Sequence, residues 1–257
     1  MRFENTEVFG FENAILGARL PMCTSLQEAK EKSDSFMCDD NATVKDCEKC
    51  RFLTDKCELG TFDNMYVIGE KDMDLMKRLI KADNKDGASG QPNSKFLRQI
   101  HVQVCITAPD YFFRELDTYK VGTVRNSSSQ MHKLASTPIT MDCFEIDDFE
   151  DLWIENEIGA YHLKDEWEET IYDLETLRKL YNETKDKRYW KELVRKLPQS
   201  WLYTSMFDCD YATLRNICSW RSNHKLNEWS GKDKQGVQNF MDWVSTLPYA
   251  KELLLNE

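Results

Sequence analysis

The chain has 257 residues, a length that can bury a core as one domain, alone or with an insertion. Its formal net charge at pH 7 is −11 and no basic stripe is visible, which argues against a nucleic-acid-binding protein. Because there is no secretory signal, long apolar run or lipidation motif, we expect a soluble cytosolic protein with no membrane partner.

The first residues predict a short strand from Arg2 to Phe9 and a helix from Phe11 to Arg19. The segment 21–60 that follows is polar and cysteine-rich, and we interpret it as an insertion or a lid. The chain has nine cysteines, and five of them lie in its first quarter. Their density in a polar segment indicates a shared chemical role.

Within this insertion, Cys47 and Cys50 form a Cys-x-x-Cys pair in a stretch with few apolar residues. Such a stretch cannot fold by burial alone, and one zinc ion bound by four thiolates would supply the missing stability. Cys38 and Cys57 flank the pair and are the expected remaining ligands, with Cys23 as a further candidate. Two alternatives stay open: a redox pair at Cys47 and Cys50, although no βαβ pattern surrounds them, and free surface thiols.

The middle of the chain carries the clearest pattern. Residues 72–82 have apolar side chains at helical spacing, and a turn-rich loop covers 83–94. Apolar and polar residues then alternate over 100–106, which predicts a strand that Pro109 ends.

An amphipathic segment carrying Arg114 and Lys120 comes next, and it breaks at Gly122 into a polar loop over 125–130. This loop is rich in hydroxyl and amide groups. Placed after a helix that bears cations, it is suited to hold a phosphate and the edge of a pyrimidine.

The second half of the chain is expected to be mostly helical. Residues 139–153 look irregular, and the predicted helices cover 165–180, 190–197, 211–229 and 237–247, with a strand at 201–207. The acidic run from Asp142 to Glu169 is most simply a solvated loop and the start of a helix. This order of elements predicts an α+β fold in which helices enclose a sheet.

The run from about residue 94 to 131 resembles the flavin-dependent thymidylate synthases. That family carries a signature Arg-His-Arg, then seven residues, then Ser, after a strand, a Pro and a short helix with an Arg-Gln pair. Here Arg114 and Glu115 stand at the pair and Ser128 stands at the serine. The three signature positions are Thr118, Tyr119 and Lys120.

Only part of the signature chemistry is kept. Arg114, Ser128 and the charge of Lys120 match the family, whereas Glu115 replaces a glutamine. Thr118 and Tyr119 stand in place of an arginine and a histidine, and Gln130 stands in place of another arginine.

A second region, residues 196–229, resembles the C-terminal half of the same family. There a Leu-Pro precedes a strand, and a helix then carries an Asn and, five residues on, an Arg. Leu197-Pro198 matches the first feature, and Asn216 and Arg221 have the spacing of the second. Two separate matches in the correct order favour the family more than either does alone.

The resemblance implies roles for individual residues. Arg221 would bind and polarise the uracil ring, because methylation of carbon 5 builds negative charge on the ring carbonyls, and Ser128 would sit at the same ring. These two are the expected catalytic residues. The residues expected to bind substrate are Arg221, Ser128, Glu115, Ser129, Gln130 and Arg195. The residues expected to bind cofactor are Gln99, Thr118, Tyr119, Lys120, Arg125, Asn126, Asn216 and Lys225, with His224 as the alternative to Lys225.

Two plainer interpretations compete with these roles. Arg221 can be an exposed or ion-paired structural arginine, and the serines at 127–129 can form a polar turn that caps the next segment. Cys218 is not expected to be a nucleophile, because reduced flavin delivers hydride directly in that family.

For the whole chain, the resemblance implies one domain over 1–257 with a central antiparallel or mixed sheet, flanking helices, and insertions at 21–60 (Cys-rich) and 132–164 (acidic). The implied activity is methylation of dUMP to dTMP with methylenetetrahydrofolate, FAD and NADPH. The family assembles as a homotetramer with sites at subunit interfaces, here in a bacterial or phage-infected host cytoplasm. The alternatives are a relative that modifies another pyrimidine nucleotide or is inactive, and a zinc-bearing interaction protein built on residues 38–57.

Overall fold

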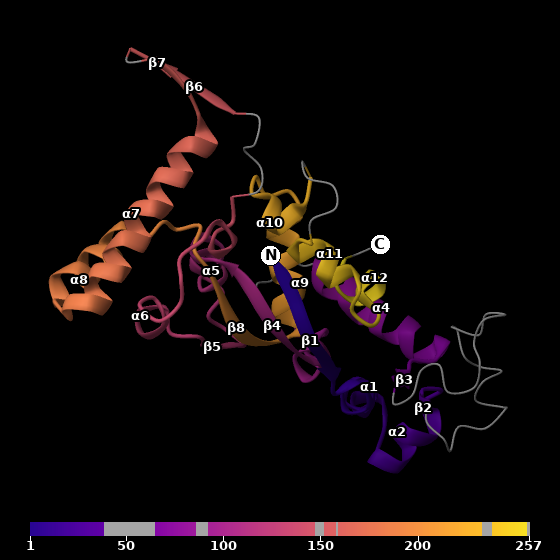
Figure 1. Ribbon diagram of the computed structural model, residues 1–257. Helices are drawn as coiled ribbons and strands as arrows, with labels where there is room; N and C mark the ends of the chain where they lie inside the picture. Colours follow the sequence, from indigo (N-terminus) through magenta and orange to yellow (C-terminus); the bar gives the residue numbers. More distant parts are fainter. Residues whose placement is uncertain (39–64, 86–91, 147–151, 158, 233–237, 256–257) are drawn as a thin grey trace.

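The computed structural model describes residues 1–38, 65–85, 92–146, 152–157, 159–232 and 238–255 (Figure 1). The strands are β1 (Arg2–Phe9), β2 (Phe36–Cys38), β3 (Met65–Val67), β4 (His101–Pro109), β5 (Thr123–Ser127), β6 (Trp153–Asn156), β7 (Gly159–His162) and β8 (Leu202–Asp210). The 3-10 helices are η1 (Leu20–Met22), η2 (Lys95–Gln99) and η3 (Met141–Cys143). The α-helices are α1 (Phe11–Arg19), α2 (Leu26–Lys32), α4 (Glu70–Lys85), α5 (Asp110–Leu116), α6 (Gln130–Lys133), α7 (Leu163–Thr184), α8 (Lys187–Lys196), α9 (Tyr211–Arg221), α10 (Asn227–Ser230), α11 (Phe240–Ser245) and α12 (Ala250–Leu253).

The centre of the molecule is an antiparallel sheet with strand order β1-β4-β8-β5. β4 and β8 pair without a register slip from His101 opposite Asp210 to Pro109 opposite Leu202. Their alternation puts apolar side chains such as Val104 and Phe207 on one buried face, as the period of two predicted. The predicted α+β fold with an antiparallel sheet is therefore confirmed.

Two hydrophobic cores result. The larger lies between the buried face of the sheet and helices α1, α4, α5 and α9 to α12, with the indoles of Trp229 and Trp243 fully or almost fully buried. The smaller joins α7 and α8 to the chain around Phe144 and Trp201. Figure 1 shows α7 and α8 packed together beside the sheet, with the β6–β7 hairpin projecting beyond α7. None of the described helices combines the length and apolar character needed to cross a bilayer.

The polar loop predicted over 125–130 is wrong in its first half. Residues 125–127 belong to β5, which pairs with the free edge of β8 from Thr123 opposite Cys209 to Ser127 opposite Ser205. β5 is an edge strand, and Val124 and Asn126 are exposed. Because polar side chains on an open sheet face carry no hydrophobic alternation, the sequence pattern hid this strand.

The predicted helix over 211–229 is also wrong in its second half. α9 ends at Arg221, and the chain turns through 222–226 before α10 begins at Asn227. Ser222, Asn223 and His224 are poor helix formers because their side chains compete for backbone hydrogen bonds. The turn lets Trp229 pack at 4.3 Å between ring centres against Phe112.

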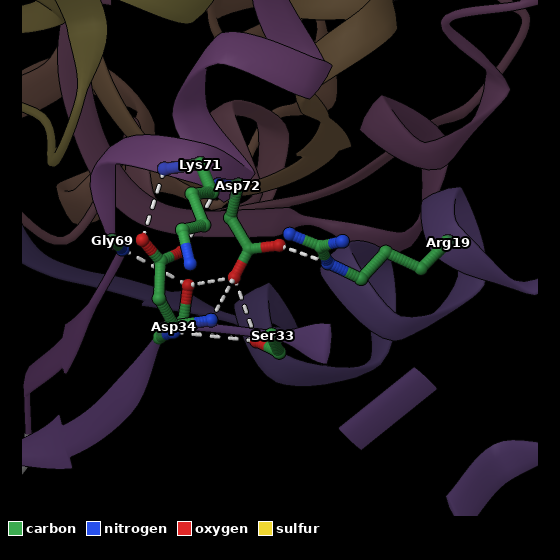
Figure 2. A network of polar contacts seen from close by, with 7 residues as sticks. Arg19, Ser33, Asp34, Gly69, Lys71 and Asp72 are labelled. Carbon is green, nitrogen blue, oxygen red and sulfur yellow. Dashed lines mark hydrogen bonds and ion pairs between the residues drawn. The ribbon is translucent and has the colours of Figure 1, made fainter. Parts of the chain in front are cut away.

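A buried carboxylate holds residues 33–35, in the described part of the cysteine-rich segment, against α4 (Figure 2). Asp72, on the first turn of α4, is fully buried and accepts hydrogen bonds from Arg19, from the hydroxyls of Ser33 and Ser35 at 2.6 Å each, and from the backbone N–H of Asp34 at 3.1 Å. Burial alone would raise the pKa of Asp72, but these donors outweigh it and hold the pKa below its usual range. In turn, the carboxylate of Asp34 accepts hydrogen bonds from the backbone N–H groups of residues 71 and 72 at the start of α4.

Candidate functional site

Arg221, the last residue of α9, lies in a fixed orientation between α5 and α10. Its Nη1 atom lies 2.9 Å from Oε2 of Glu115, and its Nε–H donates to the hydroxyl of Tyr119 at 2.9 Å. The guanidinium carbon lies 4.8 Å from the centre of the buried Trp229 ring, a cation–π distance. The side chain is 15% exposed, so the group is largely shielded from water but still reachable.

The imidazole of His224 lies close to the same carboxylate. Its Nδ1 atom accepts the backbone N–H of Leu226 at 3.2 Å, which assigns the ring proton to Nε2 in the neutral form. Nε2 lies 3.3 Å from Oε2 of Glu115. Glu115 therefore holds Arg221 and His224 together, and the turn after α9 is part of this cluster.

Two cavities flank η2. The smaller, of about 320 Å³, lies between η2, the segment after α5 and the start of α9, and it is lined by Arg98, Thr118, Tyr119, Lys120, Val121, Ala212, Thr213 and Asn216. The larger, of about 690 Å³, lies between η2, the end of α1 and α4, with Leu75, Leu79 and Phe96 among its apolar lining residues. Both volumes are in the range of small-molecule sites.

The structure gathers five of the expected cofactor-binding residues at these cavities. Thr118, Tyr119, Lys120 and Asn216 line the smaller cavity, and Gln99 lines the larger. They come from three separate elements, so the tertiary structure brings together positions that the resemblance selected one by one.

The other three expected cofactor residues lie elsewhere. Arg125 forms two hydrogen bonds to Asp117, at 2.8 and 2.6 Å, and lies 4.7 Å from the centre of the Phe113 ring. Burial would lower the pKa of Arg125, but Asp117 outweighs burial and raises it. Asn126 is exposed on β5, and Lys225 is exposed in the turn after α9.

The expected substrate residues at 128–130 follow the end of β5. The backbone N–H of Ser128 donates to the carbonyl of Thr204 at 2.8 Å, and the carbonyl of Ser129 accepts the N–H of Lys133 in the first turn after it. Gln130 begins α6. Among the described residues, no hydrogen bond or ion pair joins Ser128 to Arg221.

Arg195 is exposed on α8 and pairs with Glu192 at 3.2 Å. Of the substrate-binding set, the structure thus brings together Glu115 and Arg221 only. The interpretation of Arg221 as ion-paired is correct for this chain, and its expected role at a ring stays a prediction.

Two features at the site were not expected from sequence. Arg98 lines both cavities, although nothing but its place beside Gln99 marks it out. His224 enters the Arg221 cluster only because α9 ends early. Cys218, which is not expected to be a nucleophile, is buried, and burial raises the pKa of its thiol to about 12, so the thiol is protonated at neutral pH.

Three of the four cysteines expected to bind zinc lie outside the described residues. Cys38 ends β2, whereas Cys47, Cys50 and Cys57 lie in the segment 39–64. Within the described part of the chain, no group of three or more His, Cys, Asp or Glu side chains could hold a metal ion. Zinc binding stays a prediction.

The fold is similar to that of two crystal structures of the flavin-dependent thymidylate synthase ThyX from Helicobacter pylori with FAD and dUMP. Each has a TM-score of 0.56 over 99% of this chain, with 15% and 16% sequence identity over 98% and 97% of the ThyX chains. A UMP/dUMP methylase, PolB from Streptomyces cacaoi with 5-Br dUMP, is more distant, with a TM-score of 0.47 and 13% identity over 87% of this chain and 80% of PolB. No protein-family model and no curated protein matches the sequence. The chain therefore has the fold of the flavin-dependent thymidylate synthases.

Proposed function

We propose that this protein is a flavin-dependent enzyme that methylates carbon 5 of a pyrimidine nucleotide. Its specific reaction would be that of a thymidylate synthase, with dUMP as substrate, methylenetetrahydrofolate as carbon donor, FAD as redox relay and NADPH as reductant. The observation that carries it is the placement of Arg221: a shielded guanidinium, five residues after a cavity-lining Asn216, on a fold shared with ThyX structures that contain FAD and dUMP.

Arg221 is suited to stabilise charge on a pyrimidine ring. Its Nε and Nη1 groups face Tyr119 and Glu115, and within the described residues no hydrogen bond or ion pair involves Nη2, which leaves Nη2 to donate to a ring carbonyl. Because Trp229 and Glu115 already fix the guanidinium, little reorganisation is needed when negative charge builds on the ring. This preorganisation is the chain's contribution to the methylation step.

The residues around η2 fit FAD in size and charge. The two cavities of about 320 and 690 Å³ are lined by cations and, among their described residues, by no Asp or Glu. Lys120, Thr118, Tyr119 and Asn216 would hold the polar part of FAD, and Gln99 would contact the flavin ring. Bound FAD would supply the hydride that completes the methyl group.

The serine loop would reach the site in an assembly. Among the described residues no contact joins Ser128 to Arg221, and we infer the homotetramer that the resemblance implies, with Ser128, Ser129 and Gln130 of one subunit meeting Arg221 of another. The exposed positions of Ser128 and Arg195 fit a site that closes between subunits.

Glu115 favours a second candidate, the modification of another pyrimidine nucleotide. The related family has a glutamine here, whose amide can both donate and accept, whereas an ionised carboxylate only accepts. A carboxylate suits the exocyclic amino group of cytosine better than the carbonyl of uracil. This candidate shares the fold, the cofactor and the role of Arg221 with the first.

One experiment tests the proposal and separates the two candidates. Purified protein is examined for a flavin absorption spectrum and then incubated with FAD, NADPH, methylenetetrahydrofolate and either dUMP or dCMP labelled with tritium at carbon 5. We expect tritium release with one of the two nucleotides and none with the Arg221→Ala variant. Absence of release with both nucleotides, in protein that binds FAD, would refute the proposed reaction.

A further inference from the structure

The 3-10 helix η2 forms a wall between the two cavities. It packs against α1 on one side and against α9 on the other. Arg98, its fourth residue, lines both the cavity of about 320 Å³ and the cavity of about 690 Å³. Its side chain is exposed and forms no hydrogen bond or ion pair with any residue that the structure describes. Arg98 is therefore an available cation on a shared rim.

The charge of these cavity walls is opposite to that of the chain as a whole. The net charge of the chain is −11, yet the charged residues that line the two cavities, as far as the structure describes them, are Arg78, Lys95, Arg98 and Lys120. Arg78 is neutralised by Asp74 at 3.1 Å. The other three have no carboxylate partner among the described residues, so the site attracts an anion.

The shape of the site indicates where the anionic charge of a ligand would lie. A cation on a rim common to two cavities suits a ligand whose charge lies between two larger groups. The smaller cavity offers hydroxyl and amide groups from Thr118, Thr213 and Asn216, and the larger offers apolar side chains such as Leu79 and Phe96. A dinucleotide has this arrangement, because its diphosphate joins a planar ring system to a polar nucleoside.

We propose that Arg98 binds the diphosphate of a dinucleotide that spans the two cavities, with Lys120 as the second cation; this inference rests on the proposed function. The planar ring would occupy the larger cavity, where Gln99 lines the wall. Arg98 would thereby supply the positive charge that Thr118 and Tyr119 lack at the signature positions. A guanidinium can donate two parallel hydrogen bonds to phosphate oxygens, which an ammonium group cannot.

Equilibrium binding to the full-length protein tests this role. Three probes are titrated: FAD and NADPH, which share a diphosphate, and riboflavin, which has no phosphate. The variants are Arg98→Gln, Arg98→Lys and, as a control, Arg188→Gln, which removes a 91% exposed arginine on α8. We expect Arg98→Gln to weaken dinucleotide binding about tenfold to a hundredfold, as the loss of a charge-assisted contact does, and to reduce its salt dependence.

Riboflavin binding should change less than about twofold in Arg98→Gln, since that probe has no group for the guanidinium to hold. Arg98→Lys should recover part of the affinity, and Arg188→Gln should bind every probe like the wild type.

The outcomes separate this inference from the proposed function. Unchanged FAD affinity in Arg98→Gln would overturn the role of Arg98 and leave a flavin enzyme in place. Arg98-dependent binding of NADPH without any binding of FAD would support the diphosphate site and refute the flavin assignment. If neither dinucleotide binds at high micromolar concentration, both proposals are wrong.

Discussion

Arg221 and Glu115 form an ion pair that joins the end of α9 to α5, with Nη1 2.9 Å from Oε2. The two side chains are 15% and 33% exposed, so the pair lies at the boundary between core and solvent. An arginine in this position contributes to the stability of the fold and remains able to contact a ligand.

The pair predicts coupled losses of stability. Arg221→Ala should lower the free energy of unfolding by about 1 to 2 kcal/mol, because Glu115 then loses a partner in a partly shielded place. Glu115→Ala should lower the free energy of unfolding by a similar amount. The double variant should fall short of additivity by about 1 kcal/mol when all three are measured by urea denaturation. Fully additive losses would show that the two side chains do not interact in solution.

Removing the charge of the buried Asp72 should cost more stability than breaking the Arg221–Glu115 pair. Asp72→Asn should lower the free energy of unfolding by about 2 to 4 kcal/mol, because an amide cannot accept all the hydrogen bonds that converge on the buried carboxylate. Asp74→Asn on the same helix is the matched control, since Asp74 is exposed and, among the described residues, its side chain pairs with Arg78 alone. It should cost less than about 0.5 kcal/mol. Equal effects of the two substitutions in thermal unfolding would contradict the network in Figure 2.

Glu175 predicts how stability depends on pH. Its hydrogen bonds from Arg178 lower its pKa from 4.5 to about 2, and it also accepts the backbone N–H of Ile139 at 2.9 Å. Because the folded pKa is below the unfolded one, the contribution of Glu175 is complete above pH 4.5 and is lost as the pH falls towards 2. Glu175→Gln should therefore destabilise the protein at pH 7 and have a smaller effect at pH 3. A destabilisation of the same size at both pH values would exclude this role.

Gly10 predicts a backbone constraint beside η2. It has a φ of 97°, and an added Cβ would lie 2.1 Å from the carbonyl oxygen of Gln99. Gly10→Ala should lower the free energy of unfolding by more than about 2 kcal/mol, from strain and from the clash with backbone. Gly159→Ala, at the start of β7, is the control for the clash, because its φ of 149° also disfavours an L side chain but an added Cβ there meets nothing within 4 Å. It should cost less than Gly10→Ala. Gly10→Ala at wild-type stability would show that the β1–α1 turn can move away from η2.

Much of the fold could be predicted from sequence, because its patterns are local. The limits of β1 and α1 were correct, and α4 and α7 were placed correctly but are longer than predicted. The sheet face that carries Val104 follows from alternation alone. β5 could not be predicted, because an edge strand with exposed polar side chains gains its order from pairing with β8 rather than from its own composition.

The candidate site was predictable only in part, and for a related reason. Lys120 and Asn216, which line the smaller cavity, could be predicted as cofactor-binding residues because their positions match those of the related family. Arg98 had no such match, and it enters, like the pairing of His224 with Glu115, through contacts between elements far apart in the chain. The pairing of Arg221 with Glu115 depends on where α9 ends. The poor helix formers at 222–224 indicate that end only weakly, and the packing of the buried Trp229 that goes with it cannot be read from helix propensity.

The strand order of the central sheet also governs how the chain can fold as it is synthesised. β1 and β4 can pair once residue 109 has emerged, but among the described strands β5 has β8 as its only neighbour. Thr107 and Thr204, which face each other across β4 and β8, are 97 residues apart in the chain. The edge of β4 therefore stays open, and β5 stays unpaired, until most of the chain has left the ribosome. A nascent chain stalled before residue 202 would expose a strand edge capable of pairing with another molecule, and the slow closure of this long loop should limit the folding rate.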